Sequence, residues 1–266
     1  MLEKEEYMPK SINKYLVCFR AMVGYAHKAR LHDNVVAEKC FSKIRVRESD
    51  KAKEIYLNND ELQALYEMPL DGLEAQVRDL FLVGCYTCQR YSDYSALSAN
   101  NFTTTSRGTK VVRFIQKKTN TPVVPIMNDN LLRIAERYNF KIPSITDVIL
   151  NRLSETVPSL LNTEVTKLTM RERNMEERGD VEFMRNEDGE VIKYRYDLVT
   201  SHTARRSGIT NLYLTDLFDI VQMMSISGHK DQRIFLEYIK LSSDEIADKI
   251  MAKLRQSEEA GNEGLF

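Results

Sequence analysis

The stretch SHTARR at residues 201–206 places a histidine and an arginine, His202 and Arg205, three residues apart. Three residues make nearly one helical turn, so the two side chains share one face of a helix. Ser201 can cap that helix, because a serine oxygen accepts a free backbone N–H at a helix N-terminus. A guanidinium fork suits a phosphate or a carboxylate. The stretch therefore predicts a helix that aims a proton-transfer group and a fork of donors at one point.

Two side chains downstream complete a candidate site. His229 follows a glycine, and Tyr238 comes nine residues after His229. With the 201–206 stretch they supply a phosphate ligand, acid–base groups and a phenolic nucleophile, which indicates attack of a tyrosine on a phosphodiester. Taken alone, a histidine and an arginine at this spacing are typical of a capped, solvated helix. Tyr238 taken alone is typical of core packing.

Two upstream segments fit the same chemistry. Arg90 can bind a second phosphate oxygen, and Asp93, three residues later, can orient the site or simply cap a helix. Lys118 lies at the tip of a predicted hairpin, where a mobile ammonium group can reach a leaving oxygen. Two arginines supply the positive charge that a phosphoryl-transfer transition state needs, so this chemistry requires no metal ion and no cofactor.

The composition describes an ordinary globular protein. The chain has 266 residues, 42% of them hydrophobic and 29% charged, with a formal net charge of −1. A simple DNA-coating protein would be strongly basic, but a DNA enzyme needs only one basic face, so the net charge neither supports nor excludes nucleic acid. No apolar run approaches the ~20 residues of a membrane helix, and the N-terminus lacks a signal-peptide core. These features favour a cytoplasmic protein.

The pair Cys85-x-x-Cys88 has the spacing of a redox motif or of half a zinc site. A structural zinc site needs four ligands, and no second pair of this spacing supplies the other two. A helical pattern precedes the pair, whereas a thioredoxin-like motif follows a strand. We therefore predict buried free thiols.

The hydrophobic pattern predicts a mainly α fold with a small antiparallel β-sheet (α+β). Apolar residues recur with helical spacing at Ile12, Leu16 and Phe19, within a helix predicted over 10–30. The polar residues 45–53 are typical of a linker. Three strands of one sheet are predicted at 101–105, 110–116 and 123–126. Further helices are predicted from residue 58, over 73–84, from about residue 90, and over 128–138, 146–161, 165–177, 202–214, 218–226, 231–239 and 243–256, with a polar hairpin at 188–189.

Five motifs resemble those of the tyrosine recombinase (phage integrase) family, especially integrases of bacterial conjugative and other mobile elements. They are GCYTCQRYSD (84–93), QKKT (116–119), SHTARR (201–206), Gly228-His229 and Tyr238. Their order and spacing match the family's two arginine boxes, its β-hairpin lysine and its C-terminal tyrosine. The resemblance covers about residues 55–240. Each motif is weak alone, but the set is highly specific.

The resemblance implies the tyrosine recombinase catalytic-domain fold and a site-specific recombinase that cleaves and rejoins DNA through a 3′-phosphotyrosine intermediate. Tyr238 would attack the scissile phosphate, and Lys118 would protonate the departing 5′-oxygen. Arg90 and Arg205 would hold the non-bridging oxygens. The phosphotyrosine stores the bond energy, so neither a metal ion nor ATP would be needed.

Three further residues have supporting roles in the implied site. His202 and His229 would bond the phosphate and assist proton transfer, and Asp93 would support the site from a second layer. The implied partner is double-stranded DNA at attachment or core sites, bound by a homotetramer that forms from monomers. A host DNA-bending protein is a further expected partner, and a membrane is not. The implied place of action is the bacterial cytoplasm, on nucleoid DNA.

The resemblance also implies a division of the chain. Residues 1–50 resemble the last part of a helical core-binding domain followed by a linker, which suggests a fragment of a longer integrase. Residues 51–240 would form the catalytic domain. Residues 241–266 would form a C-terminal helix and tail that docks on a neighbouring protomer.

Two alternatives remain open. A type IB topoisomerase shares the chemistry but relaxes DNA without strand exchange. The amphipathic segment 242–256, with Ile246, Ile250 and Leu254 at helical spacing, favours the recombinase, because a monomeric topoisomerase has no need of a docking helix. A non-catalytic DNA-binding regulator with the same fold is the other alternative. The intact set of site residues speaks against it, because a binding protein needs no nucleophile.

Overall fold

In the computed structural model of this chain, the stretch at 201–206 begins helix α9 (Ser201–Leu214), as predicted. The N-cap is Thr200, whose backbone N–H donates to the Thr203 hydroxyl at 3.0 Å. The predicted cap, Ser201, is wrong by one residue, because Ser201 already belongs to the first turn and its N–H donates to Asn151 Oδ1 at 2.9 Å. Side chains from two segments therefore fix the start of the helix.

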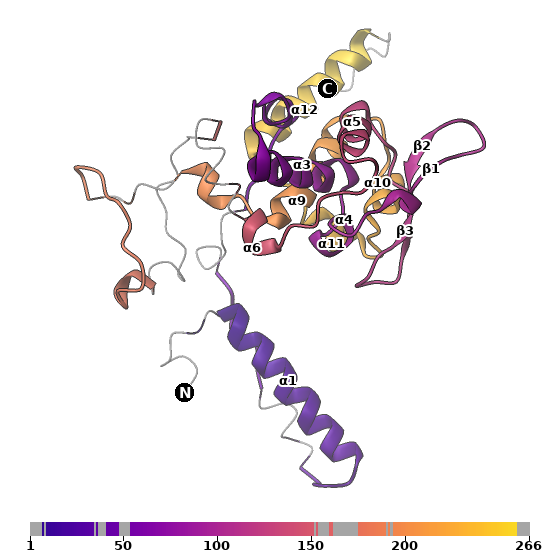
Figure 1. The fold of residues 1–266 in the computed structure, drawn as a ribbon. Helices are drawn as coiled ribbons and strands as arrows, with labels where there is room; N and C mark the ends of the chain where they lie inside the picture. Colours follow the sequence, from indigo (N-terminus) through magenta and orange to yellow (C-terminus); the bar gives the residue numbers. More distant parts are fainter. Residues whose placement is uncertain are drawn as a thin grey trace. The chain divides into compact units, whose positions relative to one another are not determined.

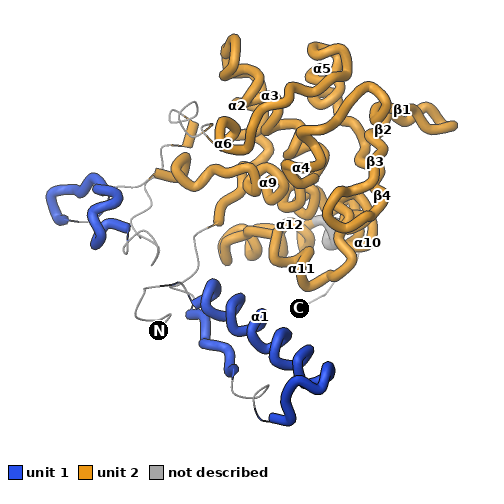
Figure 2. The backbone as a smooth tube through the Cα atoms, turned by 60° about the horizontal axis from the view of Figure 1, so that its bottom comes forward, with its two compact units in different colours: residues 1–53, 164–193 blue, residues 54–163, 194–266 orange. Residues whose placement is uncertain are grey.

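The chain divides into two units, which Figure 2 shows in different colours. Unit 1 is Met1–Lys53 with Glu164–Lys193, and unit 2 is Glu54–Thr163 with Tyr194–Phe266. Every candidate site residue lies in unit 2. The predicted division into three functional regions stays a prediction. The structure describes residues 7, 9–34, 36, 41–47, 54–151, 153, 160–161, 175–189, 191 and 194–259.

Helix α1 (Pro9–Lys28) in unit 1 confirms the helix predicted over 10–30. Ile12 is its buried residue, whereas Tyr25 is 74% exposed. The Asn13 side chain donates to Ile44 O at 2.8 Å and accepts from the Ile44 N–H at 2.7 Å. This pair of bonds fastens residues 41–47, which have no regular secondary structure, to the helix. Residues 48–53 of the predicted linker lie outside the described residues.

Helix α3 (Gly72–Thr87) forms the centre of unit 2 and packs mainly against α9 (Figure 1). Its residues from Val77 to Cys85 are all buried, which accounts for their mostly apolar side chains, and the two charged ones, Arg78 and Asp79, form an ion pair at 2.9 Å. Gly208 on α9 makes the packing possible, because a Cβ at that position would lie 2.1 Å from Cys85 O. The two helices therefore approach backbone to backbone.

The other helices of unit 2 surround this pair, and most lie where the sequence predicts them. Asn58 caps α2 through a reciprocal bond with Glu61, as expected from its sequence. None of the helices among the described residues is long and apolar enough to cross a membrane. The bounds are α2 (Asn59–Glu67), α4 (Tyr91–Tyr94), α5 (Asp129–Arg137), α6 (Asp147–Leu150), α10 (Ile220–Ser227), α11 (Gln232–Leu236) and α12 (Ser243–Glu259), with 3₁₀ helices η3 (Ala99–Asn101) and η4 (Arg195–Leu198).

Two predicted helices differ in extent. The helix predicted over 231–239 is shorter, because α11 ends at Leu236. Of the helix predicted over 146–161, α6 ends at Leu150, and residues 152 and 154–159 lie outside the described residues. Of the helix predicted over 165–177, only 175–177 are described, and they are helical. The hairpin predicted at 188–189 is confirmed by an antiparallel bridge between Arg185 and Val191.

The predicted three-stranded sheet is instead two separate two-stranded antiparallel sheets. Strand β1 (Phe102–Thr104) pairs with β2 (Lys110–Val112), and β3 (Phe114–Ile115) pairs with β4 (Pro122–Val123). The predicted strand 110–116 is interrupted at Arg113, whose N–H bonds to Asn101 O at 2.7 Å. Asn101 ends the 3₁₀ helix η3, so β1 has no further residues to pair with β3. A bridge between Val111 and Ile126 keeps the third segment beside β2.

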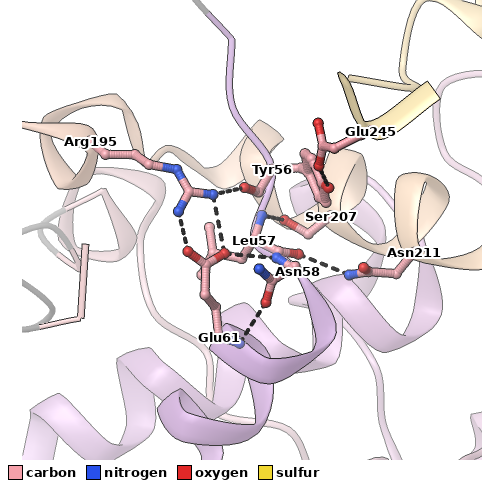
Figure 3. Close-up of polar contacts among 8 residues, drawn as sticks. All are labelled: Tyr56, Leu57, Asn58, Glu61, Arg195, Ser207, Asn211 and Glu245. Atoms are coloured by element: carbon pink, nitrogen blue, oxygen red, sulfur yellow. Dashed lines mark hydrogen bonds and ion pairs between the residues drawn. The ribbon is translucent and has the colours of Figure 1, made fainter. Parts of the chain in front are cut away.

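The segment that leads into α2 is bound to α9 (Figure 3). The Leu57 N–H donates to Ser207 Oγ at 2.9 Å, and Asn211 Nδ2 donates to Leu57 O at 2.8 Å. Leu57 is fully buried, so its backbone groups need these partners. A hydrogen bond between Tyr56 and Glu245 and an ion pair between Arg195 and Glu61 flank this contact.

Cys85 and Cys88 are buried free thiols, as predicted. Burial raises the pKa of both thiols, that of Cys88 to about 12. Because the thiolate is the reactive form, both groups are inert at neutral pH.

Candidate active site

Arg205 lies at the centre of the candidate site and is fully buried. Its Nη1 donates to Cys88 O and its Nη2 donates to Ser227 O, both at 3.0 Å. These bonds join α9 to the end of α3 and to the end of α10. Burial lowers the pKa of Arg205 to about 10, and repulsion from Arg90 adds to this shift. The guanidinium therefore stays charged at neutral pH and is held rigidly between carbonyl groups.

His229 follows α10 and contacts Arg205 directly. Its Nε2 lies 2.9 Å from Arg205 Nη2, and its Nδ1 lies 2.9 Å from Ser227 Oγ. The Ser227 hydroxyl donates its proton to Met223 O at 2.8 Å, so it accepts from the imidazole. This pattern assigns the proton to Nδ1 and leaves Nε2 as an acceptor for the arginine.

The imidazole of His229 is neutral at physiological pH. The residue is 8% exposed, and burial, together with the charges of Arg205 and Arg90, lowers its pKa to about 3. A neutral imidazole beside two guanidiniums avoids a third positive charge in the cluster. It is also able to accept a proton, which an imidazolium is not.

Tyr238 lies just beyond α11, in contact with both of these side chains. Its ring centroid is 4.9 Å from that of His229 and 5.2 Å from Arg205 Cζ. Its backbone O accepts from Thr210 Oγ1 of α9 at 3.1 Å, and its N–H donates to Phe235 O at 3.0 Å. The structure thus brings Arg205, His229 and Tyr238 together, as the sequence predicts.

Arg90 joins this cluster through two intermediaries. Its Nη1 donates to Gln116 Oε1 at 3.2 Å, and Gln116 Nε2 donates to Ser227 O at 2.9 Å. That same carbonyl accepts from Arg205. Arg90 is half-buried and immediately precedes α4, so its side chain lies at the rim of the cluster.

Asp93 contacts the β3–β4 hairpin. It is 4% exposed, and its Oδ1 accepts the backbone N–H of Lys117 at 2.9 Å. Its Oδ2 has no hydrogen-bond partner among the described residues. The carboxylate therefore holds the turn that carries Lys118, and it lies within α4 instead of capping it.

Lys118 and His202 are exposed and lie outside the central contacts. Lys118 occupies the β3–β4 turn, as predicted, and forms no hydrogen bond or ion pair with any described residue. His202 lies in the first turn of α9, and partial burial followed by repulsion from Arg206 and Arg205 lowers its pKa. His202 and Arg205 lie about 60° apart around the helix, and of the two only Arg205 belongs to the central contacts, so their aim at one phosphate stays a prediction. Arg205 faces α3, and His202 faces outward.

Several solved structures have a fold similar to that of this chain. An integrase of transposon Tn1549 in complex with transposon right end DNA is 11% identical, with a TM-score of 0.57 over 96% of this chain and 81% of the other. A lambda integrase dimer bound to a COC′ core site is 14% identical, with a TM-score of 0.50 over 88% and 80% of the two chains. The chain has the tyrosine recombinase fold.

The similarity of this chain to the solved structures lies in the fold, and the overall sequence identity is low. No protein-family model and no curated protein sequence matches the chain. A structure of the XerH site-specific recombinase bound to a palindromic difH substrate is 16% identical, with a TM-score of 0.42. It covers 77% of this chain, which spans about half (52%) of the XerH chain. The motifs that resemble those of tyrosine recombinases are matched by a fold similar to that of the Tn1549 and lambda integrases.

Four polar residues that connect the site were not predicted as functional: Gln89, Gln116, Thr119 and Ser227. Gln116 and Gln89 are fully buried, and Gln116 Nε2 donates to Gln89 Oε1 at 2.6 Å. The sequence signal for Gln116 is a long polar side chain at the end of a β-branched, apolar strand. In this chain these four side chains link the β3–β4 hairpin to the ends of α3 and α10.

Proposed function

We propose that this chain is a site-specific DNA recombinase that breaks and rejoins DNA strands through a covalent bond between Tyr238 and a 3′-phosphate. The contact of the buried Arg205 with both His229 and the Tyr238 ring carries the proposal. In the reaction the phenol oxygen attacks phosphorus, the bond from phosphorus to the 5′-oxygen breaks, and the 5′-oxygen takes up a proton. Attack by a 5′-hydroxyl on the phosphotyrosine reverses these steps, so rejoining needs no ATP.

The two arginines hold the phosphate in this mechanism. Arg205 Nε is buried and has no hydrogen-bond partner among the described residues, which leaves one donor free for a ligand. Arg90 provides a second guanidinium, which is linked to Arg205 through Gln116 and the Ser227 carbonyl. Donors fixed before the substrate arrives stabilise the charge that develops on the non-bridging oxygens. The Tyr238 ring lies across Arg205, so the ring shifts when a phosphate binds.

Proton transfer is divided between buried and exposed groups. His229 is neutral and contacts the Tyr238 ring, and its Nε2, which accepts from Arg205 in the structure, would accept the phenol proton once the phosphate takes over the Arg205 donor. Lys118 is exposed in a turn and delivers a proton to the 5′-oxygen once DNA is bound. His202, on the outer face of α9, bonds the phosphate from the DNA side. Asp93 acts through the hairpin backbone.

The proposed substrate is double-stranded DNA at the attachment or core sites of a mobile element in the bacterial cytoplasm. The Tn1549 and lambda structures contain DNA, and the lambda integrase is a dimer. The proposed assembly on DNA is a tetramer, and helix α12 supports it. A host DNA-bending protein is proposed as a further partner. Its Lys249 pairs with Asp216 of the same chain at 2.6 Å, yet Ile246, Ile250 and Met251 are 47%, 52% and 49% exposed. These exposed apolar side chains are available to a neighbouring protomer.

Covalent trapping tests the proposal. The chain is incubated with nicked suicide duplexes built from the ends of the element that encodes it, and SDS-resistant protein–DNA adducts are counted. The expected adduct disappears in Tyr238→Phe. It persists in Tyr213→Phe, a matched control that alters another half-buried tyrosine beneath a cation, here Lys249. Exchange of strands between two duplexes, tested in the same reaction, separates a recombinase from a topoisomerase that only relaxes DNA.

A further inference from the structure

The Gln116 side chain uses its full hydrogen-bonding capacity. Oε1 accepts from Arg90 Nη1 at 3.2 Å and from Thr119 Oγ1 at 2.6 Å. Nε2 donates to Gln89 Oε1 at 2.6 Å and to Ser227 O at 2.9 Å. An amide offers two acceptor positions and two donor hydrogens, so all four are occupied. The residue is fully buried, which makes each of these bonds costly to lose.

These four bonds fix the orientation of the amide. If the oxygen and nitrogen were exchanged, Nε2 would face the donor of Arg90, and Oε1 would face the carbonyl oxygen of Ser227. Neither pair can form a hydrogen bond. The amide therefore has one stable orientation, with its oxygen toward Arg90 and its nitrogen toward α10.

The same residue closes the turn that carries Lys118. The Gln116 N–H donates to Thr121 O, and its own O accepts from the Asn120 N–H, both at 2.9 Å. The bond from Thr119 Oγ1 to the Gln116 side chain adds a third connection across the turn. The Gln116 side chain thus connects the turn to the arginines, while Asp93 holds the same turn through the Lys117 N–H.

Gly228 accommodates Gln116 against α10. A Cβ at residue 228 would lie 2.4 Å from Gln116 Nε2, and the backbone there has φ +72°. Glycine meets both demands, because it has no Cβ and adopts positive φ without strain. The glycine before His229 is therefore explained by the space that Gln116 occupies.

We propose that Gln116 is a positioning residue, whose amide sets the distance between the turn that carries Lys118 and the two guanidiniums of Arg90 and Arg205. The inference rests on the proposed function, because it assigns the turn and the arginines to one reaction. Arg90 bonds the amide oxygen, and Arg205 shares the Ser227 carbonyl with the amide nitrogen. A displaced amide therefore changes the distance between the proton donor and the phosphate ligands.

Two substitutions test this role by covalent trapping. Gln116→Met keeps the size without hydrogen bonds, and Gln116→Glu keeps the acceptors but cannot donate to Ser227 O. Both variants are expected to form the adduct about 10- to 100-fold more slowly, because a misplacement of about 1 Å has effects of this size. Duplex affinity, measured by gel shift, should stay within a few-fold of the parent. Gln222→Glu is the matched control, because this exposed amide only accepts the Asp219 N–H, which a carboxylate also does.

A duplex with sulfur in place of the bridging 5′-oxygen separates positioning from general loss of structure, because a thiolate leaves without a proton. Gln116→Met should recover at least several-fold on this duplex, whereas Arg205→Lys should not. Rates of Gln116→Met and Gln116→Glu within twofold of the parent, or equal defects on both duplexes, would overturn the inference.

Hydrogen exchange gives a test that needs no catalysis. In Gln116→Met the backbone amides of Lys117 and Asn120, which donate to Asp93 Oδ1 and Gln116 O, should exchange at least about tenfold faster, since the turn loses its bond to the Gln116 side chain. Unchanged exchange would overturn the positioning role even if the parent forms adducts. If exchange is faster in Gln116→Met but the parent forms no adduct, the positioning role would be supported and the proposed recombinase function would be refuted.

Discussion

The two halves of the candidate site differ in how firmly they are held. Arg205 is fully buried, with three hydrogen-bonding neighbours contributed by α3, α10 and the residue after Gly228. Lys118 is exposed in a turn and has no partner among the described residues. The difference matches two chemical tasks. Groups that stabilise charge work best when fixed in advance, whereas a proton donor to a leaving group needs to arrive only with the substrate.

The largest expected effect comes from Tyr238, the proposed nucleophile, whose ring lies against the buried Arg205. Tyr238→Phe should abolish covalent attachment while leaving the thermal unfolding midpoint and gel-shift affinity nearly unchanged, because only the phenol oxygen is lost. The measurement is an SDS-resistant adduct on the suicide duplex. An adduct that persists in this variant would remove Tyr238 as the nucleophile.

Replacing the arginines by lysine tests the rigid half directly. Arg205→Lys and Arg90→Lys should each slow adduct formation by about 100- to 1,000-fold, because an ammonium cannot reproduce a two-pronged contact with phosphate. Arg205→Lys should also lower the free energy of unfolding by about 1–3 kcal/mol, since it strands buried carbonyl groups. Arg206→Lys, which can keep its ion pair with Glu54, is the matched control. Near-parent rates for both arginine variants would show that neither binds the phosphate.

The role of Lys118, in the exposed half of the site, is tested by changing the atom that leaves the phosphorus. Lys118→Ala should slow cleavage of ordinary DNA by about 100-fold or more, the usual contribution of a general acid. The same variant should cut the 5′-thio duplex nearly as fast as the parent, whereas Arg205→Lys should not be rescued. Lys117→Ala is the neighbouring control, also exposed. Equal defects of Lys118→Ala on both duplexes would mean that Lys118 only contacts the DNA backbone.

The smallest expected effect concerns pH and stability. The pKa of His229 is about 3 in the folded chain and about 6.5 when unfolded. Between these values the unfolded state binds a proton that the folded state does not, so stability falls as pH falls through this window. The contribution is at most about 1.4 kcal/mol per pH unit. Urea unfolding of His229→Gln between pH 7 and 5 should show a shallower slope than the parent, and the exposed His202→Gln should show less change. Identical slopes for the parent and His229→Gln would contradict a buried neutral imidazole.

Local patterns predicted the elements that carry the site, and tertiary contacts set the details that the patterns missed. The start of α9 was found within one residue, because capping side chains act over three or four positions. The break at Arg113 depends on where the neighbouring strand ends, which the sequence of 110–116 does not contain. His202 and Arg205 were correctly placed on one helix, but which of them faces α3 is decided by packing.

The connecting residues were missed for the same reason. Gln116 and Ser227 are separated by 111 positions, and Arg205 and Cys88 by 117. A buried polar side chain is informative only when its distant partner is known. Motif spacing predicted the charged and nucleophilic groups, whereas the amides and carbonyls that align them became visible only in the folded chain.

The close approach of α9 to α3 has a consequence for natural variation in this chain. A methyl group at Gly208 would meet Cys85 O at 2.1 Å and Cys88 Sγ at 2.7 Å. Relief of that clash would push apart the two backbones on which Arg205 and its acceptor, Cys88 O, are mounted. Selection should therefore retain glycine at position 208 as strictly as the arginine itself, although the residue is buried and has no side chain with which to touch a substrate.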